Sequence, residues 1–452
     1  MRTPDDMGVT DEGRRARQFS FAGHRYDAAS GEATLSYELD GRTLDETVTF
    51  PWAPWPADAS HQAAFLQALE LLHLIAGISY YKAGLARSIN CGENRVDQLL
   101  AGFLNELYIR GLGEFAYVNQ VDISSLVDFR ANADDAPGAL DLDLAERALV
   151  AMGGGKDSLV CLQMLLEAGV EVQPACVGGS ALIGETVSAT GLPLIRIRRQ
   201  LSPALAQINA SGAWNGHVPV TAINSAILLC ASLLYGYRYV VFANESSANE
   251  ATLTDDQGRE VNHQYSKSLA FETAFRDVVR QRVSPGVEYF SLLRPFNEIA
   301  IARRFAGMTE YHALFSSCNR NFHQDGSHID GRWCQDCPKC RFTALALAPF
   351  LNPEQVIAIQ GADLLGDRNQ LRGFKALCGL GLHKPFECVG SIAESRAVMK
   401  MLSTHSLWQG KRVVKALADV AEIRQAGAPE LVPDARADHC IPAAILAKIN
   451  AF

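Results

Sequence analysis

Apolar and polar positions change their period along the chain, and each change separates one region from the next. Three short segments near the amino end alternate apolar and polar side chains, as strands do: residues 19–26, 33–39 and 47–50. Two longer segments carry apolar side chains three and four positions apart, as helices do: residues 61–87 and 95–108. This order predicts an α+β N-terminal domain over residues 1–127, whose first 17 residues are charged and are expected to be disordered.

The pattern breaks at residues 128–145, where Pro137-Gly138 and several aspartates predict a linker. Beyond it, short apolar runs alternate with helical segments. We expect strands at 148–152, 170–177, 192–197 and 239–243, with helices at 158–167 and 220–234. Such alternation is typical of a parallel sheet with helices on both faces. Residues 146–350 are therefore predicted to form an α/β domain, and residues 351–452 a mostly helical C-terminal region.

The junction between the first of these strands and its helix is rich in glycine. It reads Gly153-Gly154-Gly155-Lys156-Asp157-Ser158. Glycines let the backbone turn tightly and bring N–H groups close to an anion, and a helix N-terminus adds partial positive charge. Lys156 can supply a cation and Ser158 a hydroxyl donor, while Asp157 would hold Mg²⁺ or order the loop. The pattern indicates a phosphate-binding loop, although a plain strand–helix turn would also explain it.

The junction fits neither the Walker pattern nor the dinucleotide-binding fingerprint. It resembles the PP-loop signature of ATP pyrophosphatases, S-G-G-x-D-S, with Gly153 where that family usually has Ser. This departure removes one phosphate-facing hydroxyl and keeps the backbone cradle. The resemblance implies a PP-loop sheet domain of the adenine nucleotide alpha hydrolase type, with ATP and Mg²⁺ as cofactors and AMP and pyrophosphate as products.

Two neighbouring segments support a nucleotide pocket. Residues 216–219 precede the predicted helix at 220–234, and Asn244-Glu245 follows the next strand. Both segments resemble the corresponding region of the 7-cyano-7-deazaguanine synthases, which are also PP-loop enzymes. The resemblance implies that His217, Asn244 and Glu245 contact substrate, although a histidine alone is more often structural.

The chain holds eleven cysteines, and four of them lie close together: Cys318, Cys334, Cys337 and Cys340. Two-residue spacing lets neighbouring thiolates face one point, and four thiolates suit a tetrahedral, structural Zn²⁺ ion. The same synthases carry a similar cysteine pattern. An iron–sulfur cluster, or four reduced cysteines without metal, are the alternatives.

Charge and composition narrow the class of partner. The chain has 452 residues with a net charge of −9, and an acidic balance disfavours a nucleic-acid partner. Neither a signal-peptide pattern nor an apolar run of about 18 residues is visible, so we expect a cytoplasmic protein without a membrane partner.

Other segments carry side chains able to bind a substrate or move a proton. His263, Tyr265 and Lys267 belong to a dense polar run, for which a solvated loop is the alternative. Glu387 and Cys388 lie in a glycine-flanked break between predicted helices, where a free thiol is more often simply packed.

Tyr81 and Lys82 stand at the end of an apolar helix. They could clamp an aromatic ring or a diphosphate of a substrate. The alternative, an ordinary amphipathic helix end, is slightly favoured.

Four segments together resemble one family over about residues 80–390: GGGKDS, NHQYSKS, WCQDCPKCRF and HKPFECVG. The family is that of the ATP-dependent UDP-N-acetylmuramoyl-L-alanyl-L-glutamate epimerases of peptidoglycan synthesis. The resemblance implies an isomerase that converts the terminal L-Glu of a UDP-sugar dipeptide to D-Glu. It also raises the question of functional coupling to the ligase that adds L-Glu.

The implied chemistry is coherent. The glutamate amine is acylated, so a Schiff base is unattainable, and an α-proton beside a free carboxylate is very weakly acidic. Adenylation turns that carboxylate into a mixed anhydride able to delocalise an enolate. One alternative is another adenylating PP-loop enzyme, such as an amide or nitrile synthase or a tRNA-modifying enzyme. Another is a non-catalytic nucleotide-binding or zinc scaffold protein.

Overall fold

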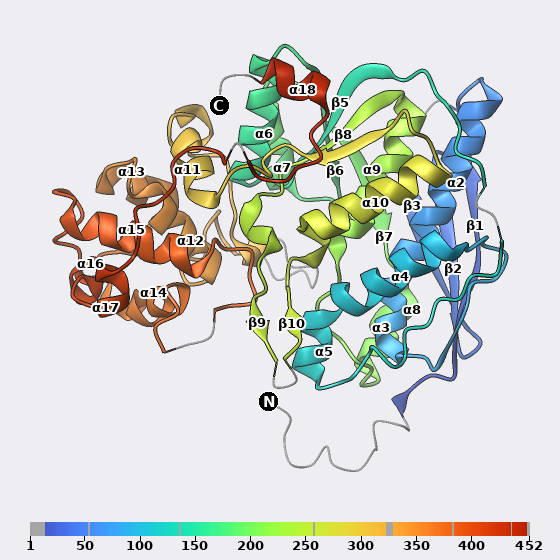
Figure 1. The fold of residues 1–452 in the computed structure, drawn as a ribbon, viewed down its shortest axis with the longest axis horizontal. Helices are drawn as coiled ribbons and strands as arrows, with labels where there is room; N and C mark the ends of the chain where they lie inside the picture. Colours follow the sequence, from blue (N-terminus) through green and yellow to red (C-terminus); the bar gives the residue numbers. More distant parts are fainter. Residues whose placement is uncertain are drawn as a thin grey trace. The chain divides into compact units, whose positions relative to one another are not determined.

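The computed structural model describes most of the chain: residues 14–52, 55–134, 137–255, 258–321, 329–381, 384–434 and 436–449. The expectation of disorder for residues 1–17 concerns a segment that lies mostly outside these ranges. Helices and strands together give an α/β fold with a large sheet, as predicted (Figure 1).

Within the described residues, nine strands form the larger sheet in the order β11-β8-β5-β6-β7-β3-β2-β1-β4. Their bounds are β1 Gln18–Asp27, β2 Glu32–Leu39, β3 Arg42–Thr49, β4 Ser88–Asn90, β5 Ala145–Ala151, β6 Glu171–Val177, β7 Ile195–Gln200, β8 Tyr237–Phe242 and β11 Glu288–Ser291. A short hairpin pairs β9 (Leu253–Thr254) with β10 (Glu260–Val261).

The main helices of the amino-terminal half are α2 Ala59–Ala76, α3 Ile78–Gly84, α4 Gln98–Gly111, α5 Gly113–Asn119, α6 Lys156–Glu167, α7 Ala181–Ser188, α8 Pro203–Ala210 and α9 Val220–Tyr235. Those of the other half are α10 Leu269–Arg282, α11 Glu298–Ala306, α12 Pro338–Leu347, α13 Pro353–Gln360, α14 Leu371–Leu377, α15 Ile392–Thr404, α16 Arg412–Leu417, α17 Ala421–Arg424 and α18 Ala443–Lys448. Short 3₁₀ turns include η2 Ser246–Asn249 and η3 Tyr265–Lys267.

The predicted amino-terminal strands are confirmed as an antiparallel meander, β1-β2-β3. Alternation places Phe19, Leu35 and Val48 inside, each essentially without exposed surface. A bulge between Phe21 and Gly23 shifts the β1–β2 register. The helix expected at 61–87 is present as α2 and α3, which meet at Gly77 in right-handed helical conformation (φ −53°). Glycine is needed there because a Cβ would meet the Phe21 ring at 2.5 Å.

The chain divides into two compact units, each described by itself. The first comprises Met1–Glu146, Arg196–Val240 and Gln264–Tyr289. Within it, α2 packs against α9 and α4 against α10. The described part of the predicted linker is without helix or strand until β5 begins, and Leu140 N donates to Val283 O at 2.9 Å.

A buried ion pair joins two strands of this first unit. Arg199 on β7 donates through Nε and Nη2 to the two carboxylate oxygens of Glu46 on β3, at 2.7 and 3.1 Å. Glu46 has no exposed surface, and Ser79 accepts a further bond from Arg199 at 3.0 Å. The bidentate geometry satisfies both charges, which burial would otherwise penalise.

The second unit comprises Arg147–Ile195, Val241–His263 and Phe290–Phe452. Its strands β5 and β6 are parallel, with Leu149 opposite Gln173, as the alternating pattern predicted. Helix α6 packs against β6 and α11, and α12 packs against α11, α13, α14 and α15. The helices α12 to α17, drawn orange to red in Figure 1, confirm a mostly helical C-terminal region.

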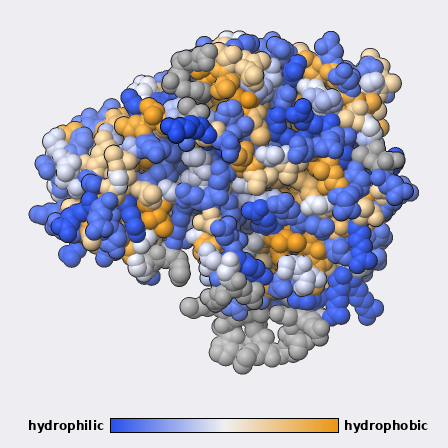
Figure 2. Space-filling view, in the orientation of Figure 1, coloured by the Kyte–Doolittle hydropathy of each residue, from blue (hydrophilic) through white to orange (hydrophobic). Residues whose placement is uncertain are grey.

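One helical stretch among the described residues, Ala59–Gly84, is long and apolar enough to cross a membrane, but 78% of its apolar window is buried inside the structure. Such burial is what a core helix requires. On the face shown in Figure 2, hydrophobic residues form separate patches among hydrophilic ones.

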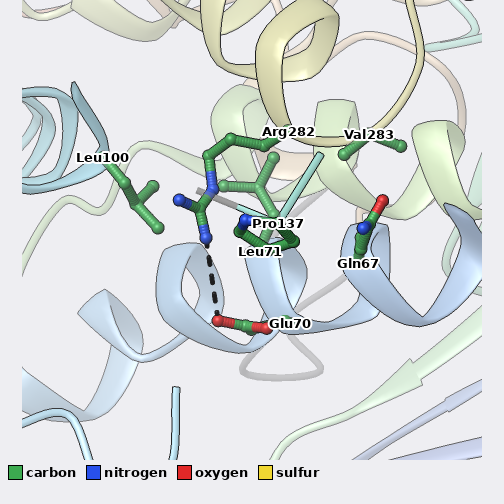
Figure 3. Close-up of a pocket in the computed structure, with 7 residues that line it drawn as sticks. All are labelled: Gln67, Glu70, Leu71, Leu100, Pro137, Arg282 and Val283. Carbon is green, nitrogen blue, oxygen red and sulfur yellow. Dashed lines mark ion pairs between the residues drawn. The ribbon is translucent and has the colours of Figure 1, made fainter. Parts of the chain in front are cut away.

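A small cavity in the first unit lies where the linker meets α2 and α10 (Figure 3). Its volume of about 10 Å³ is room for roughly one water molecule. Arg282 points across it toward Glu70, 3.9 Å away, and also donates to Asp97 at 2.5 Å. The cavity is too small for any substrate, so its charged groups serve the fold.

Replacing Arg199 with Met should destabilise the protein by about 3 kcal/mol or more, because Glu46 would keep a buried, unpaired charge. Thermal unfolding would show this as a lower midpoint. The double variant Glu46→Leu/Arg199→Met should recover much of the loss. Arg130→Met is the matched control, because its pair with Asp128 is exposed at the surface. An equal fall of the thermal midpoint in Arg130→Met and Arg199→Met would contradict the stabilising role of the buried Glu46–Arg199 pair.

Candidate nucleotide site and cysteine centre

The glycine-rich junction lies in the second unit, between the end of β5 and the start of α6. Gly154 has φ +77°, a conformation that side chains with a Cβ rarely adopt. Gly155 caps α6, and a Cβ there would come within 3.1 Å of Ser317 Oγ. Ser316 N donates to Gly154 O at 3.1 Å. The backbone conformation of Gly154 and the close approach of Ser317 to Gly155 therefore explain why these two positions are glycines.

Lys156 is buried and paired. Its Nζ donates to the carboxylates of Asp157 and Glu298, and only 3% of the residue is exposed. Burial by itself lowers the pKa of Lys156, but the two carboxylates outweigh it and hold that pKa above its ordinary value. Lys156 is therefore held between Asp157 and Glu298 of α11.

Ser158 is also buried, and its hydroxyl donates to Gly155 O at 3.1 Å. Gly153 is exposed, and a Cβ there would meet no atom within 4 Å. The accessible part of the junction is thus its backbone together with the half-buried Asp157. The N–H of Gly153 donates to Ser158 Oγ at 3.4 Å.

Glu245 and Glu394 belong to the same charged cluster as Lys156, Asp157 and Glu298. Burial raises the pKa of Glu245 to about 7, with Glu394 adding to the effect. Burial also raises the pKa of Glu298 to about 8, although Lys156 opposes the shift. Glu394 accepts from Glu298 N at 2.8 Å and from Ser391 N at 2.7 Å, so it ties α11 to the start of α15.

This cluster contains more carboxylates than cations. Mg²⁺ ions in proteins are usually bound by carboxylate oxygens together with the phosphates of a substrate. Asn244 and Glu245, predicted to contact substrate, follow β8 and are both buried. Asn244 donates to Ser291 Oγ at 2.9 Å, and Glu245 accepts from Ser247 Oγ at 2.8 Å. The structure therefore brings Glu245 to the charged cluster around Lys156.

The four predicted cysteines meet in space. The sulfurs of Cys318, Cys334, Cys337 and Cys340 all lie within 4.8 Å of one another. Three of the sulfur separations are 3.8, 4.0 and 3.4 Å. A tetrahedral ion with Zn–S bonds of about 2.3 Å needs sulfurs about 3.8 Å apart. This spacing fits a single ion, and an iron–sulfur cluster would need the thiolates farther apart.

The remaining predicted residues of this unit lie beside the cysteine loop. Glu387 accepts from the side chain of Asn319, which follows Cys318. Burial raises the pKa of Glu387 to about 7, while Lys339 opposes the rise. The His263 ring lies 6.4 Å from that of Phe386. Cys388 is half-buried. The first residue of the HKPFECVG segment, His383, lies outside the described residues.

In the first unit, two predicted tyrosines are core residues. Tyr81 has no exposed surface, and its hydroxyl donates to Ala86 O at 3.4 Å. Tyr265 is 1% exposed, and the guanidinium of Arg110 lies 4.6 Å from its ring centre. A ring so enclosed packs the core in this structure instead of facing a ligand. Lys267 is half-buried on η3.

Lys82 and His217 converge on one loop of the first unit. Lys82 Nζ donates to Asn215 Oδ1 at 2.6 Å, and His217 Nδ1 lies 3.5 Å from Glu114 Oε2. Neither contact follows from the spacing in the sequence. Glu114 and Glu298 were missed because isolated glutamates at helix starts carry no distinguishing pattern, whereas Glu394 could have been found from the capping-box spacing Ser391-x-x-Glu394.

A larger pocket of the second unit, about 650 Å³, contains none of the predicted site residues. It borders Gln335 of the cysteine segment and carries charges of both signs, including Lys411, Arg412 and Asp363. Lys411 is already paired with Asp363 at 2.5 Å. Its mixed, internally paired charge gives no clear ligand preference.

An α/β fold with a glycine-rich strand–helix junction and four clustered cysteines defines the class of protein to which this chain belongs. Known families narrow that class. The domain described as MurL N-terminal matches residues 10–292, and that described as MurL C-terminal matches residues 314–430. The chain belongs to the MurL epimerase family and is an enzyme of the isomerase class.

Three relatives carry the name UDP-N-acetyl-alpha-D-muramoyl-L-alanyl-L-glutamate epimerase. The one from Xanthomonas oryzae pv. oryzae is 44% identical, over 96% of this chain and 97% of the relative. That from a Micromonospora strain is 39% identical, over 90% of this chain and 91% of the relative. That from Salinispora tropica is also 39% identical, over 90% and 89%.

Protein purified without an affinity metal should contain about one zinc ion per chain. Cys337→Ser should lose the ion and unfold at a lower temperature, because the three remaining thiolates would repel one another or protonate without it. Cys440→Ser, a half-buried cysteine outside the cluster, is the matched control and should keep its metal. Elemental analysis measures both zinc and iron. A wild-type protein that contains neither metal would contradict the assignment of a metal ion to the four cysteines.

Proposed function

We propose that this enzyme converts the terminal L-Glu of UDP-N-acetylmuramoyl-L-alanyl-L-glutamate to D-Glu in peptidoglycan precursor synthesis. The observation that carries the proposal is 44% identity, over nearly the whole of both chains, to a relative bearing that name. A cytoplasmic site of action and coupling to the ligase that adds L-Glu belong to the same proposal. The alternative PP-loop activities have no support in the comparisons.

We propose further that ATP activates the substrate as an acyl-adenylate. The α-proton of the terminal glutamate lies beside a carboxylate, where an enolate would place two negative charges on adjacent atoms. A mixed anhydride with AMP removes one of them and makes the enolate accessible. Proton removal, proton return on the opposite face and hydrolysis then give the D-Glu product, AMP and pyrophosphate.

The residues of the second unit receive roles in this scheme. Gly153, Gly154 and Gly155 offer backbone N–H groups to the phosphates, with Lys156 and Ser158 beside them. Asp157 would hold Mg²⁺. Lys156 donates to Asp157 and Glu298 here, so its third N–H would be the one that donates to a phosphate.

The four-cysteine centre would hold a structural Zn²⁺, because four thiolates leave no open position for a substrate. The roles of His263, Lys267, Glu387 and Cys388 stay candidate roles in substrate contact or proton transfer. Tyr265 would act through packing, given its burial.

Incubation with ATP, Mg²⁺ and the L-Glu muramoyl dipeptide tests the reaction. We expect AMP, pyrophosphate and D-Glu after chiral analysis of the hydrolysed product. In D₂O the product should carry deuterium at its α-carbon, because the proton exchanges with solvent during the reaction. A D-Glu product without any deuterium would exclude the open deprotonation route, and absence of AMP would exclude adenylation.

Two glycine variants separate the backbone cradle from its side chains. Gly154→Ala should introduce strain of about 1–2 kcal/mol at φ +77° and sharply slow AMP formation. Gly153→Ser meets no atom within 4 Å at its Cβ, so it should fold normally. It restores a hydroxyl, and the KM for ATP should stay equal or fall. Initial rates of pyrophosphate release measure the activity of both variants. Equal rates for Gly154→Ala and Gly153→Ser would contradict the proposal that the backbone of the turn binds the phosphates.

A further inference from the structure

The ammonium group of Lys156, beside the glycine-rich turn, is held by two carboxylates. Its Nζ donates to Asp157 at 2.5 Å and to Glu298 of α11. Only 4% of the Lys156 side chain is exposed. In the described part of the chain, no third acceptor is bonded to this Nζ, although an ammonium group has three N–H donors. One donor is therefore left for a ligand.

The two carboxylates hold Lys156 in different ways. Asp157 is the next residue of the same turn, and 33% of its side chain is exposed. Glu298 comes from another helix, α11, which packs against α6, and 9% of its side chain is exposed. A lysine side chain has a flexible four-carbon stem, so a partner outside its own turn is needed to fix its end relative to the rest of the unit. Glu298 provides that partner.

Glu298 is itself held by a carboxylate from the C-terminal helices. It is the first residue of α11, and its N–H donates to Glu394 Oε1 at 2.8 Å. The side chain of Asn297 caps the next two N–H groups of this helix, at 3.0 and 2.8 Å. The other oxygen of Glu394 accepts from Ser391 N at 2.7 Å, in the capping box of α15. Glu394 thus joins the first turns of α11 and α15.

A capping box alone does not require a carboxylate at position 394. In α13 of the same unit, Gln355 occupies the equivalent position and completes the box with an amide. The carboxylate of Glu394 carries a cost, because burial and the nearby Glu298 both raise its pKa. An amide has one acceptor oxygen, whereas a carboxylate has two, and both are used here. The second oxygen of Glu394 therefore serves Glu298 and not the cap of α15.

We propose that Glu298 is the positioning residue that holds the ammonium of Lys156 for the phosphates of ATP, and that Glu394 holds Glu298 in turn. This assignment rests on the proposed function. The contacts need not break when the nucleotide binds, because the third N–H of Lys156 is the donor to a phosphate. Use of ATP at the glycine-rich turn thereby depends on α15, a helix of the C-terminal region.

Two substitutions of Glu298 test the positioning. Glu298→Ala removes the acceptor and leaves Lys156 with Asp157 alone, so the KM for ATP should rise at least about tenfold, the usual effect of losing a hydrogen bond to a charged group. Glu298→Gln keeps an oxygen in the same place, so its KM for ATP should lie at least about threefold below that of Glu298→Ala. The KM for the muramoyl dipeptide should change in neither variant. Initial rates of pyrophosphate release at varied concentrations of each substrate give both constants.

Glu394→Gln tests the connection to α15. An amide offers one oxygen to the two N–H groups, so residue 394 no longer joins the two helices. We expect the KM for ATP to rise about threefold or more. The double variant Glu298→Ala/Glu394→Gln should show no further rise over Glu298→Ala, because Glu394 acts only through Glu298. Glu354→Gln, at an exposed glutamate in the first turn of α13, is the matched control and should change neither KM.

The kinetic constants separate positioning from folding. A purely structural role would lower the thermal midpoint and the fraction of active enzyme, and it would leave both KM values unchanged. The same KM for ATP in Glu298→Ala and in the wild type would overturn the role of Glu298. Additive rises in the double variant would overturn the connection through Glu394. Where Glu298→Ala fails to fold, an unchanged KM for ATP in Glu394→Gln overturns the proposal by itself.

A binding measurement distinguishes this inference from the proposed function. Calorimetric titration of the wild-type enzyme with ATP and Mg²⁺, without the dipeptide, should show binding. Glu298→Gln should bind ATP more weakly, and Glu298→Ala more weakly still. A wild-type enzyme that binds no ATP would overturn the proposed use of ATP. Binding by the wild type, with equal affinity in Glu298→Ala, would overturn the positioning role alone.

Discussion

The buried ion pair between Lys156 and Glu298 is the interaction on which the second unit depends. It closes the glycine-rich turn against α11, and the cost of burying the charges is met only because they lie together. Glu394 then binds the backbone of α11 and begins α15, so a single chain of polar contacts runs from the turn to the C-terminal helices.

The cysteine centre is connected to the same turn. Ser316 donates its N–H to Gly154 O, and its hydroxyl accepts from the N–H of Cys318 at 3.1 Å. The hydroxyl in turn donates to Arg332 O at 2.7 Å, just before Cys334. The segment that carries the first cysteine therefore also packs on the glycine-rich turn.

Much of the fold was predictable because local physics agreed with the final packing. Strand alternation predicted the β1–β3 meander, and the glycine run predicted the β5–α6 turn, where φ +77° and close contacts require glycine. The cysteine spacing predicted a centre that the sulfur positions form. The need for glycine at position 77 was not predictable, since the Phe21 ring that lies against it comes from a strand far away in the sequence.

By itself, the sequence determined where many strands and helices lie, where the glycine-rich turn begins and which thiolates gather, because these properties depend on neighbours a few residues apart. Only the tertiary structure decided the long-range electrostatic partners. Glu298 reaches Lys156 from a segment more than a hundred residues away, and Glu394 in turn reaches the backbone of Glu298. Tyr81 is enclosed by the core, and among the described residues the adjacent Lys82 pairs with an amide oxygen instead of a carboxylate. Burial and long-range pairing set the charge state of a side chain, and neither is encoded in its immediate neighbours.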